Sequence, residues 1–330
     1  MSTITLKARS GRLLKEKLDI GKDVTNATVD DLKTAIHKAF PKYYPSRQRL
    51  TVGMLDSFDV AYFYRVAVPE LVLFNFTLDN KALEKGQTLQ QHGIKAGDTI
   101  VFKDLGPQIG WTTVFLIEYF GPILIHPLFY FFPQIFYPGT GAQSHTRIQT
   151  LTLLLTILHF LKREYETVFV HRFSNDTMPI RNLPKNCAHY WILGGLAIAY
   201  PIYRPGFNGG LFGGAHSDLF VNSLLALWAW AQVSNFLTHV TLRNLRPPGT
   251  RVRKIPHGYG FNWVSCPNYF FEVMGWLAVA LLTGSASAYF FLIAGFGQMY
   301  LWAVKKHIRY KKDFGAAYPR SRKVIIPFLL

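Results

Sequence analysis

The chain contains few cysteines and few acidic residues. Cys187 and Cys266 are the two cysteines among 330 residues, too few for a disulfide framework and without metal-ligand spacing. Aspartate and glutamate number 19 against 36 lysines and arginines, so the formal net charge is +17. The N-terminal residues are polar and lack the apolar core of a cleavable signal peptide, and none is expected.

Several short motifs with well-understood chemistry are also missing. The eleven histidines form no HxxHH or HExxH cluster, which argues against a di-iron desaturase or a zinc protease, and no metal is expected. The glycine-rich segment 209–214 does not match GxGxxG, so we expect a turn there rather than a phosphate cradle. The sequence therefore does not indicate a soluble nucleotide-binding fold.

Hydrophobic residues are abundant despite the high charge. They make up 49% of the chain, aromatic residues make up 15%, and the mean hydropathy is +0.12. From Trp111 onward apolar runs alternate with short basic loops, whereas residues 1–104 are typical of a soluble domain. Because the positive charge lies between apolar segments rather than on one soluble face, no nucleic-acid partner is expected.

The first hundred residues predict a small α+β domain. Thr28 and Asp31 have the spacing of a capping box, with aspartate in place of glutamate, and the helix that they begin is expected to end near Phe40, before Pro41. Four strands are expected, at 4–8, near 14–20, at 50–52 and at 99–103. The segment Leu83–Ile100 resembles the late part of ubiquitin-like β-grasp domains. We expect such a domain to stabilise the protein or dock a partner rather than to catalyse a reaction.

The remainder, residues 105–330, predicts an α-helical polytopic membrane protein with about six spans. Apolar stretches lie near 111–137, 148–162, 187–203, 217–241, 268–284 and 286–304. An even number of spans puts both termini on one side of the membrane. Segment 241–271 has five basic residues and no acidic one, and segment 305–323 has eight basic residues and only Asp313. The positive-inside rule therefore predicts that these loops, both termini and the N-terminal domain are cytosolic.

Polar residues within or beside the expected spans are the candidates for chemistry. Glu118 lies inside an apolar run, ten residues after Gln108, and an ionisable group there indicates a functional site unless it only pairs with a neighbouring helix. Lys162 and Arg163 end the second span, where such residues commonly anchor a helix at the membrane surface.

A second set of polar residues surrounds the acid-free basic loop. Asn235 and His239 share one helix face that leads to Arg246, an arrangement suited to a phosphorylated ligand because guanidinium groups bind phosphate bidentately. A helix-stabilising role for Asn235, and anionic lipid head groups as the arginines' partners, are the alternatives. The polar octet Ser265–Glu272 begins the next apolar segment, where unpaired polar groups are costly.

Several of these segments, in this order, resemble the steroid 5α-reductase superfamily. They are Leu242–Gly249, Lys254–Pro256, Val264–Glu272, His307–Tyr310 and Tyr318–Pro327. The ubiquitin-like part, Asp104–Ile109, Glu118-Tyr119 and Phe169–Pro179 resemble, more narrowly, the very-long-chain trans-2-enoyl-CoA reductases of the endoplasmic reticulum. The resemblance extends over nearly the whole chain.

The resemblance implies an NADPH-dependent enzyme that reduces the trans-2 double bond of very-long-chain enoyl-CoA, the last step of each fatty-acid elongation cycle. Tyr269 resembles the family's catalytic tyrosine, and Gln108 and Glu118 resemble polar residues of its first span. The expected cofactor-binding residues are Asn235, Arg246, Glu272, Tyr310, Arg163 and Asn268. Steroid reductases have an acidic residue at the position of His239 and a tyrosine at that of Arg253, so cofactor contacts at these two positions are in question.

The residue types fit the implied reaction. Hydride addition to the β-carbon leaves negative charge on the thioester oxygen, which a hydrogen-bond donor stabilises, and the α-carbon then takes a proton. Tyr269 is the expected proton donor, and a protonated Glu118 can share the oxyanion role. The acyl chain is expected among the spans, with CoA at the cytosolic basic rim, and membrane lipid and elongase enzymes are the expected partners. The alternatives are a steroid or polyprenol reductase and a non-enzymatic membrane adaptor.

Overall fold

The computed structural model describes residues 2–52, 82–139, 144–173, 175–209, 217–247 and 254–329. Contacts divide the chain into two compact units, Met1–Ile109 with Thr177–Arg181, and Gly110–Asp176 with Asn182–Leu330. The predicted glycine-rich turn after Gly209, and Arg251 and Arg253 of the basic loop, lie outside the described residues. The domain boundary at residue 104 stays a prediction.

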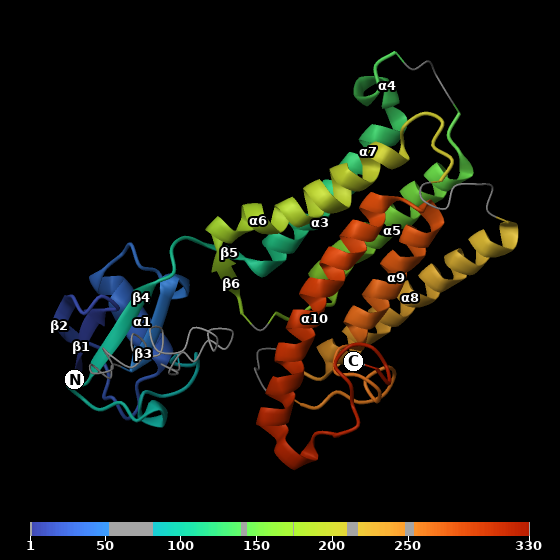
Figure 1. The fold of residues 1–330 in the computed structure, drawn as a ribbon. Helices are drawn as coiled ribbons and strands as arrows, with labels where there is room; N and C mark the ends of the chain where they lie inside the picture. Colours follow the sequence, from blue (N-terminus) through green and yellow to red (C-terminus); the bar gives the residue numbers. More distant parts are fainter. Residues whose placement is uncertain are drawn as a thin grey trace, which may run out of the picture. The chain divides into compact units, whose positions relative to one another are not determined.

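In its described residues, 2–52, 82–109 and 177–181, the first unit contains a four-stranded mixed sheet and one long helix. Its elements are β1 (Thr3–Ala8), β2 (Leu13–Asp19), α1 (Val29–Ala39), η1 (Pro45–Arg47), β3 (Gln48–Val52), η3 (Gln90–His92) and β4 (Thr99–Asp104). The strand order is β2-β1-β4-β3, with β1 and β4 parallel at the centre and antiparallel strands at both edges (Figure 1). All four strands expected from the sequence are confirmed.

The capping box predicted for the first helix is present. The Thr28 hydroxyl accepts a hydrogen bond from the Asp31 backbone N–H at 3.2 Å, and an Asp31 carboxylate oxygen accepts one from the Thr28 N–H at 2.9 Å. These two bonds satisfy N–H groups that the first turn of a helix leaves unpaired. The helix ends at Ala39, with Phe40 as its C-cap, and buries Val29, Leu32 and Ile36 against the sheet core.

The second unit is helical. Its helices are α3 (Trp111–Phe131), α4 (Pro133–Phe136), α5 (Arg147–Phe169), α6 (Leu183–Cys187), η5 (Ala188–Ala197), α7 (Ile198–Ile202), α8 (Asp218–Asn244), α9 (Pro267–Thr283), α10 (Ala286–Phe314) and η6 (Gly315–Ala317). Helix α9 packs on α8 and α10, and α3 packs on α5 and η5 (Figure 1). A short sheet pairs β5 (Gln108–Gly110) with β6 (Thr177–Pro179), which is followed by the short helix η4 (Ile180–Asn182).

Two helices of the described part are long and apolar enough to cross a membrane. They are Trp111–Phe131 and Ala286–Ala317, the latter combining α10 with η6. Both coincide with predicted spans, and their length and composition agree with a membrane protein. The full count of six spans stays a prediction.

The apolar stretch 187–203, expected as one span, consists of three helical pieces. Residues Ala188–Ala197 form a π-helix between the short helices α6 and α7. This wide helix lies very close to α3, because a Cβ added at Gly121 would come within 2.4 Å of the Trp191 ring. The Trp191 indole N–H donates to the Ile117 carbonyl at 2.9 Å. Glycine at residue 121 therefore allows the contact that sets the position of α3, the helix that carries Glu118.

Candidate functional site

The helical unit encloses a cavity of about 1080 Å³. Small-molecule sites commonly occupy about 300–1,000 Å³, so this space is large enough for an extended ligand or two ligands. Residues from α3, α5, α6, η5, α8, α9 and α10 line it. Eight of the nine residues predicted for the site are among them: Glu118, Arg163, Asn235, Arg246, Asn268, Tyr269, Glu272 and Tyr310.

Gln108 is the predicted residue that is not among those lining the cavity. It lies on β5, where its side-chain amide donates to the Gly106 carbonyl at 3.0 Å and accepts from the Thr177 hydroxyl at 3.1 Å. Its backbone N–H donates to the Tyr44 hydroxyl at 2.9 Å. In this structure Gln108 therefore holds the start of β5, and its catalytic role stays a prediction.

The lining is strongly cationic. Among the described residues it contains eight lysines and arginines and two glutamates. Arg172, Arg243 and Arg246 lie together where α5 and α8 end, and Arg172 and Arg246 each donate to the other's backbone carbonyl. An excess of fixed positive charge in a partly enclosed space favours an anionic ligand such as one that carries phosphate groups.

Glu118 is buried on α3 with one side-chain oxygen unpaired. The residue is 2% exposed, Oε1 has no hydrogen-bond partner, and the carboxyl group interacts with Asn186 of α6. Buried carboxyl oxygens nearly always have a partner, so an unpaired one in a cavity wall is a position at which a ligand can complete the bonding. The functional role expected for Glu118 from its place in an apolar run stays a prediction.

Arg163 is held on the cavity side of α5. Its guanidinium donates to the Tyr119 hydroxyl at 2.9 Å, lies 5.1 Å from the centre of that ring, and forms an ion pair with Glu166. Lys162 donates to the Asn235 side-chain oxygen and lies 3.3 Å from Glu166 Oε1. The side chains of Lys162 and Arg163 are only 16% and 12% exposed, so the interpretation of these two residues as surface anchors is wrong.

Two asparagines link α8 to the start of α9. The Asn235 amide N–H donates to the Asn268 backbone carbonyl at 2.8 Å, and the Asn268 amide nitrogen lies 3.5 Å from Nε2 of His239. Asn268 Oδ1 is buried and has no partner. Because the amide nitrogen faces His239, this oxygen is the acceptor that Asn268, a cavity-lining residue, keeps unpaired.

Tyr269 and Tyr310 approach the cavity from α9 and α10. Tyr269 is partly buried with Cys266 and Ala303, and Lys306 lies close enough for its charge to act on the hydroxyls of both tyrosines. Lys306 Nζ is 5.8 Å from the centre of the Tyr310 ring. This lysine was not singled out from the sequence, because it is one of eight basic residues in segment 305–323.

Glu272 lies one turn beyond Tyr269 on α9. Its Oε1 is 3.2 Å from Nε2 of His159 on α5, and Nδ1 of that ring is 3.1 Å from the Gln232 side-chain oxygen on α8. Since Glu272 also lines the cavity, its predicted contact with a cofactor and its observed contact with His159 are compatible.

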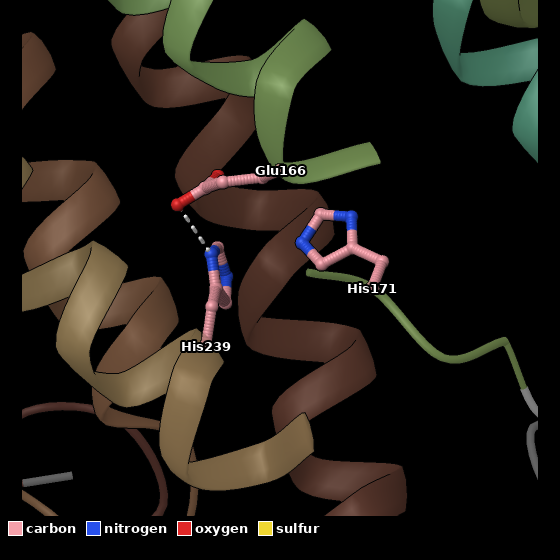
Figure 2. Close-up of side chains that lie close together, drawn as sticks. All are labelled: Glu166, His171 and His239. Carbon is pink, nitrogen blue, oxygen red and sulfur yellow. Dashed lines mark ion pairs between the residues drawn. The ribbon is translucent and has the colours of Figure 1, made fainter. Parts of the chain in front are cut away.

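Glu166, His171 and His239 form the one group of potential metal ligands found in the described part of the chain. Their ligand atoms lie within 4.8 Å of one another, and Figure 2 shows the three side chains converging from α5, the loop after it and α8. Burial, followed by the charges of Arg163 and His239, lowers the His171 pKa to about 3, so this imidazole is neutral near pH 7.

Fixed charges next to this group oppose a metal ion. Lys162 and Arg163 both contact the Glu166 carboxylate, so its single negative charge is already compensated. A divalent cation about 4 Å from a unit positive charge is repelled by about 8 kcal/mol at an effective dielectric constant of about 20. The arrangement therefore favours a hydrogen-bonded and ion-paired network over a metal centre.

Comparison with known proteins identifies the family. The model of the 3-oxo-5-alpha-steroid 4-dehydrogenase family matches residues 176–330, and that of the TECR ubiquitin-like domain matches residues 10–58. A very-long-chain enoyl-CoA reductase of Dictyostelium discoideum is 43% identical over 253 residues, which cover 76% of this chain and 80% of the relative. The chain belongs to the very-long-chain enoyl-CoA reductase family of the steroid 5α-reductase superfamily.

A mammalian relative extends the match over the N-terminal unit. A trans-2,3-enoyl-CoA reductase-like protein of Mus musculus is 31% identical over 318 residues, covering 94% of this chain and 80% of the relative. The family resemblance predicted from the sequence is confirmed, and the chain is an oxidoreductase of the enoyl-CoA reductase type. This identification argues against the membrane-adaptor alternative. A reductase of this family uses a nicotinamide cofactor.

Proposed function

We propose that the protein catalyses NADPH-dependent reduction of the trans-2 double bond of very-long-chain enoyl-CoA, the last step of the fatty-acid elongation cycle. The observation that carries the proposal is that one cavity combines Tyr269, a buried Glu118 with one unpaired carboxyl oxygen, and a cationic wall. The enoyl-CoA reductases named above supply the substrate class.

The residues of the cavity fit a phosphorylated nicotinamide cofactor. Arg172, Arg243, Arg246 and Lys254 would hold its phosphate groups, since guanidinium and ammonium groups both bind phosphate oxygens. The unpaired Asn268 Oδ1 is an acceptor for an amide N–H group of the cofactor. Asn235, Glu272, Arg163 and Tyr310 line the same space and complete the proposed binding set. When bound, NADPH supplies the hydride that is added to the β-carbon.

Tyr269 and Glu118 have the two remaining roles, which are proton donation and stabilisation of the oxyanion. Negative charge develops on the thioester oxygen, and a protonated Glu118 donates a hydrogen bond to it. Tyr269 donates the proton that the α-carbon takes up, and Lys306 stabilises the phenolate that results because its positive charge lies nearby. Trp276, Phe291 and Leu292, which also line the cavity, would contact the acyl chain.

The proposed cellular setting follows from the charge pattern. Six spans, cytosolic termini and an endoplasmic-reticulum location bring the ubiquitin-like domain, residues 1–104, and the basic loops to the side where acyl-CoA and NADPH are found. Elongase-cycle enzymes and membrane lipid are the proposed partners. Protease protection of sealed microsomes tests the topology, because both chain ends should be cleaved without detergent.

The function is tested by NADPH oxidation with the purified full-length protein. We expect turnover with a very-long-chain trans-2-enoyl-CoA, and much slower or no turnover with a steroid enone or with NADH. Tyr269→Phe should lower kcat by about 10²–10⁴-fold, the range for loss of a general acid. Tyr165→Phe, at a 53% exposed position of α5, is the matched control and should retain full activity. Turnover of the steroid but not of the CoA ester would favour the steroid-reductase alternative.

A further inference from the structure

Glu166 is a buried carboxylate at the centre of the polar network, but it is not among the residues that line the described cavity. Its exposure is 0%, and it lies near the C-terminal end of α5. One carboxylate oxygen accepts from Arg163, and the other lies 3.3 Å from Lys162 Nζ. That second oxygen is also 3.1 Å from His239 Nδ1, the pair joined by the dashed line in Figure 2. A single anionic group thus contacts two cations and an imidazole.

Each of these three partners contacts a further residue that lines the cavity. Arg163 donates to the Tyr119 hydroxyl at 2.9 Å. Lys162 donates to the Asn235 side-chain oxygen, and the Asn235 amide donates in turn to the Asn268 backbone. Glu166 is therefore connected to the cavity through Arg163 on its own helix, α5, and through Asn235 on α8.

The third connection runs through His239. Nδ1 lies 3.1 Å from Glu166 Oε1 and 3.4 Å from Arg163 Nη1. With the ring proton on Nδ1, directed at the nearer carboxylate, Nε2 accepts from the Asn268 amide nitrogen at 3.5 Å. That arrangement leaves Oδ1 as the unpaired acceptor of Asn268, a residue that lines the cavity. A rotated amide would instead put two acceptors, Oδ1 and Nε2, against each other. The tautomer of one imidazole thereby selects which atom the asparagine presents.

We propose that Glu166 is a positioning residue that orients Arg163, Asn235 and Asn268 for binding of the nicotinamide cofactor. The inference rests on the proposed function for the cofactor's identity. Because Glu166 has no surface of its own in the cavity, its effect passes through these partners.

The direction in which Glu166→Gln changes the Kd for NADPH separates a positioning role from a simple charge effect. Glu166→Gln removes a negative charge near an anionic cofactor, so a through-space effect alone would strengthen NADPH binding. Loss of positioning would weaken it, and we expect a 10- to 100-fold rise in Kd, the size expected when a charged hydrogen-bonding partner is lost. A purely structural role would lower the melting temperature and leave Kd unchanged.

The experiment is calorimetric titration of the purified full-length protein with NADPH, together with KM for NADPH and kcat. Glu164→Gln is the matched control, because it makes the same change two residues earlier on α5, where Glu164 faces Leu116, Phe120 and Trp191 instead. Its Kd should equal that of the wild type. Glu166→Asp keeps the charge on a shorter side chain and should recover part of the lost affinity.

A double-mutant cycle provides a second measurement. If Glu166 acts through His239, Glu166→Gln and His239→Asn combined should raise Kd little more than the more damaging single change. Unchanged or tighter binding by folded Glu166→Gln would overturn the proposal, and fully additive effects in the cycle would overturn the part of it that runs through His239. If Glu166→Gln does not fold, an unchanged Kd for both Glu166→Asp and His239→Asn would overturn the proposal instead. A wild-type protein that binds NADPH but does not reduce enoyl-CoA would refute the proposed substrate alone.

Discussion

Glu272 on α9 and His159 on α5 form a buried pair, with 3.2 Å between Oε1 and Nε2. Gln232 of α8 lies 3.1 Å from the other ring nitrogen, so one imidazole connects three helices around the cavity. The pair holds Glu272 one turn from Tyr269, the proposed proton donor. The contact accounts for a histidine that is 3% exposed in the middle of an otherwise apolar part of α5.

Replacement of His159 by phenylalanine keeps the ring volume but removes both contacts. We expect weaker NADPH binding and a lower melting temperature, because the Glu272 carboxylate loses a charge-assisted hydrogen bond of about 1.5–3 kcal/mol. Titration with NADPH and thermal unfolding in detergent check this. His145→Phe is the control, because that ring stacks on Tyr130 and phenylalanine preserves the stacking. Equal effects of the two variants would contradict the role of the pair.

Glu118→Gln tests the oxyanion role of the unpaired carboxyl group. We expect kcat to fall by about 10²-fold or more, in the range for loss of an oxyanion-stabilising donor. Stability should be unchanged or slightly higher, because the native carboxyl oxygen Oε1 has no partner to lose. Steady-state kinetics with saturating enoyl-CoA and a thermal melt measure the two effects. A drop in melting temperature with little change in kcat would assign Glu118 to packing.

Gly121→Ala tests the close approach of α3 to the π-helix. The new methyl group would come 2.4 Å from the Trp191 ring, so one of the two helices must move. We expect destabilisation of about 1–3 kcal/mol and reduced activity, since Glu118 is on the displaced helix. Gly297→Ala on α10 meets nothing within 4 Å and should be neutral or slightly stabilising. Thermal unfolding of both variants provides the comparison.

Thr28→Ala tests the capping box of the N-terminal unit. Loss of the cap should destabilise helix α1 by about 1 kcal/mol, which hydrogen exchange of the amides in Val29–Ala39 would report in the full chain. Thr34→Ala is the control, because the Thr34 hydroxyl only bonds the Asp30 carbonyl within the helix. Enzyme activity should not change in either variant. Faster exchange in Thr34→Ala than in Thr28→Ala would contradict the capping argument.

Stability should fall on acidification in part because of His171. Burial and the nearby charges of Arg163 and His239 lower its pKa in the folded protein to about 3, against a value of about 6.5 when unfolded. Between these values the unfolded chain binds the proton and the folded chain does not, so stability decreases as pH falls from about 6.5 toward 3. Melting temperatures at pH 7.5 and 5.0 should differ less for His171→Asn than for the wild type. An equal difference in melting temperature for the two proteins would show that His171 does not contribute to the loss of stability on acidification.

Local patterns predicted most of the first unit correctly. Strands β1 and β4 alternate buried and partly buried side chains, and the capping box and proline mark the ends of helix α1. There, short-range preferences and the tertiary fold agree. The same reasoning predicted the long helices of the second unit. It missed the π-helix at 188–197, because an apolar run has the same composition whether it winds with 3.6 or more residues per turn.

The candidate site was predicted mainly where a polar residue interrupts an apolar run or a family motif marks it. The residues of that character are Glu118, Asn235, Asn268, Tyr269 and Glu272, and all five line the cavity. The contacts of three further residues were missed because each bonds to a residue more than 70 positions away in the sequence. They are His159 with Glu272, Lys162 with Asn235, and Glu166 with His239. The spacing of Lys162 and Glu166, four residues apart on one helix face, was the available signal.

The sequence by itself determined the division into a soluble α+β part and an apolar helical part, the family, and most residues of the proposed site. These properties depend on residue order and local periodicity, which are read along the chain. Only the tertiary structure decided that Glu166 pairs with both Lys162 and Arg163 and that Glu272 pairs with His159. It also decided that the Gln108 side chain bonds to Gly106 and Thr177. Such pairings depend on which helices pack together, and burial makes them energetically important because water no longer competes for the charges.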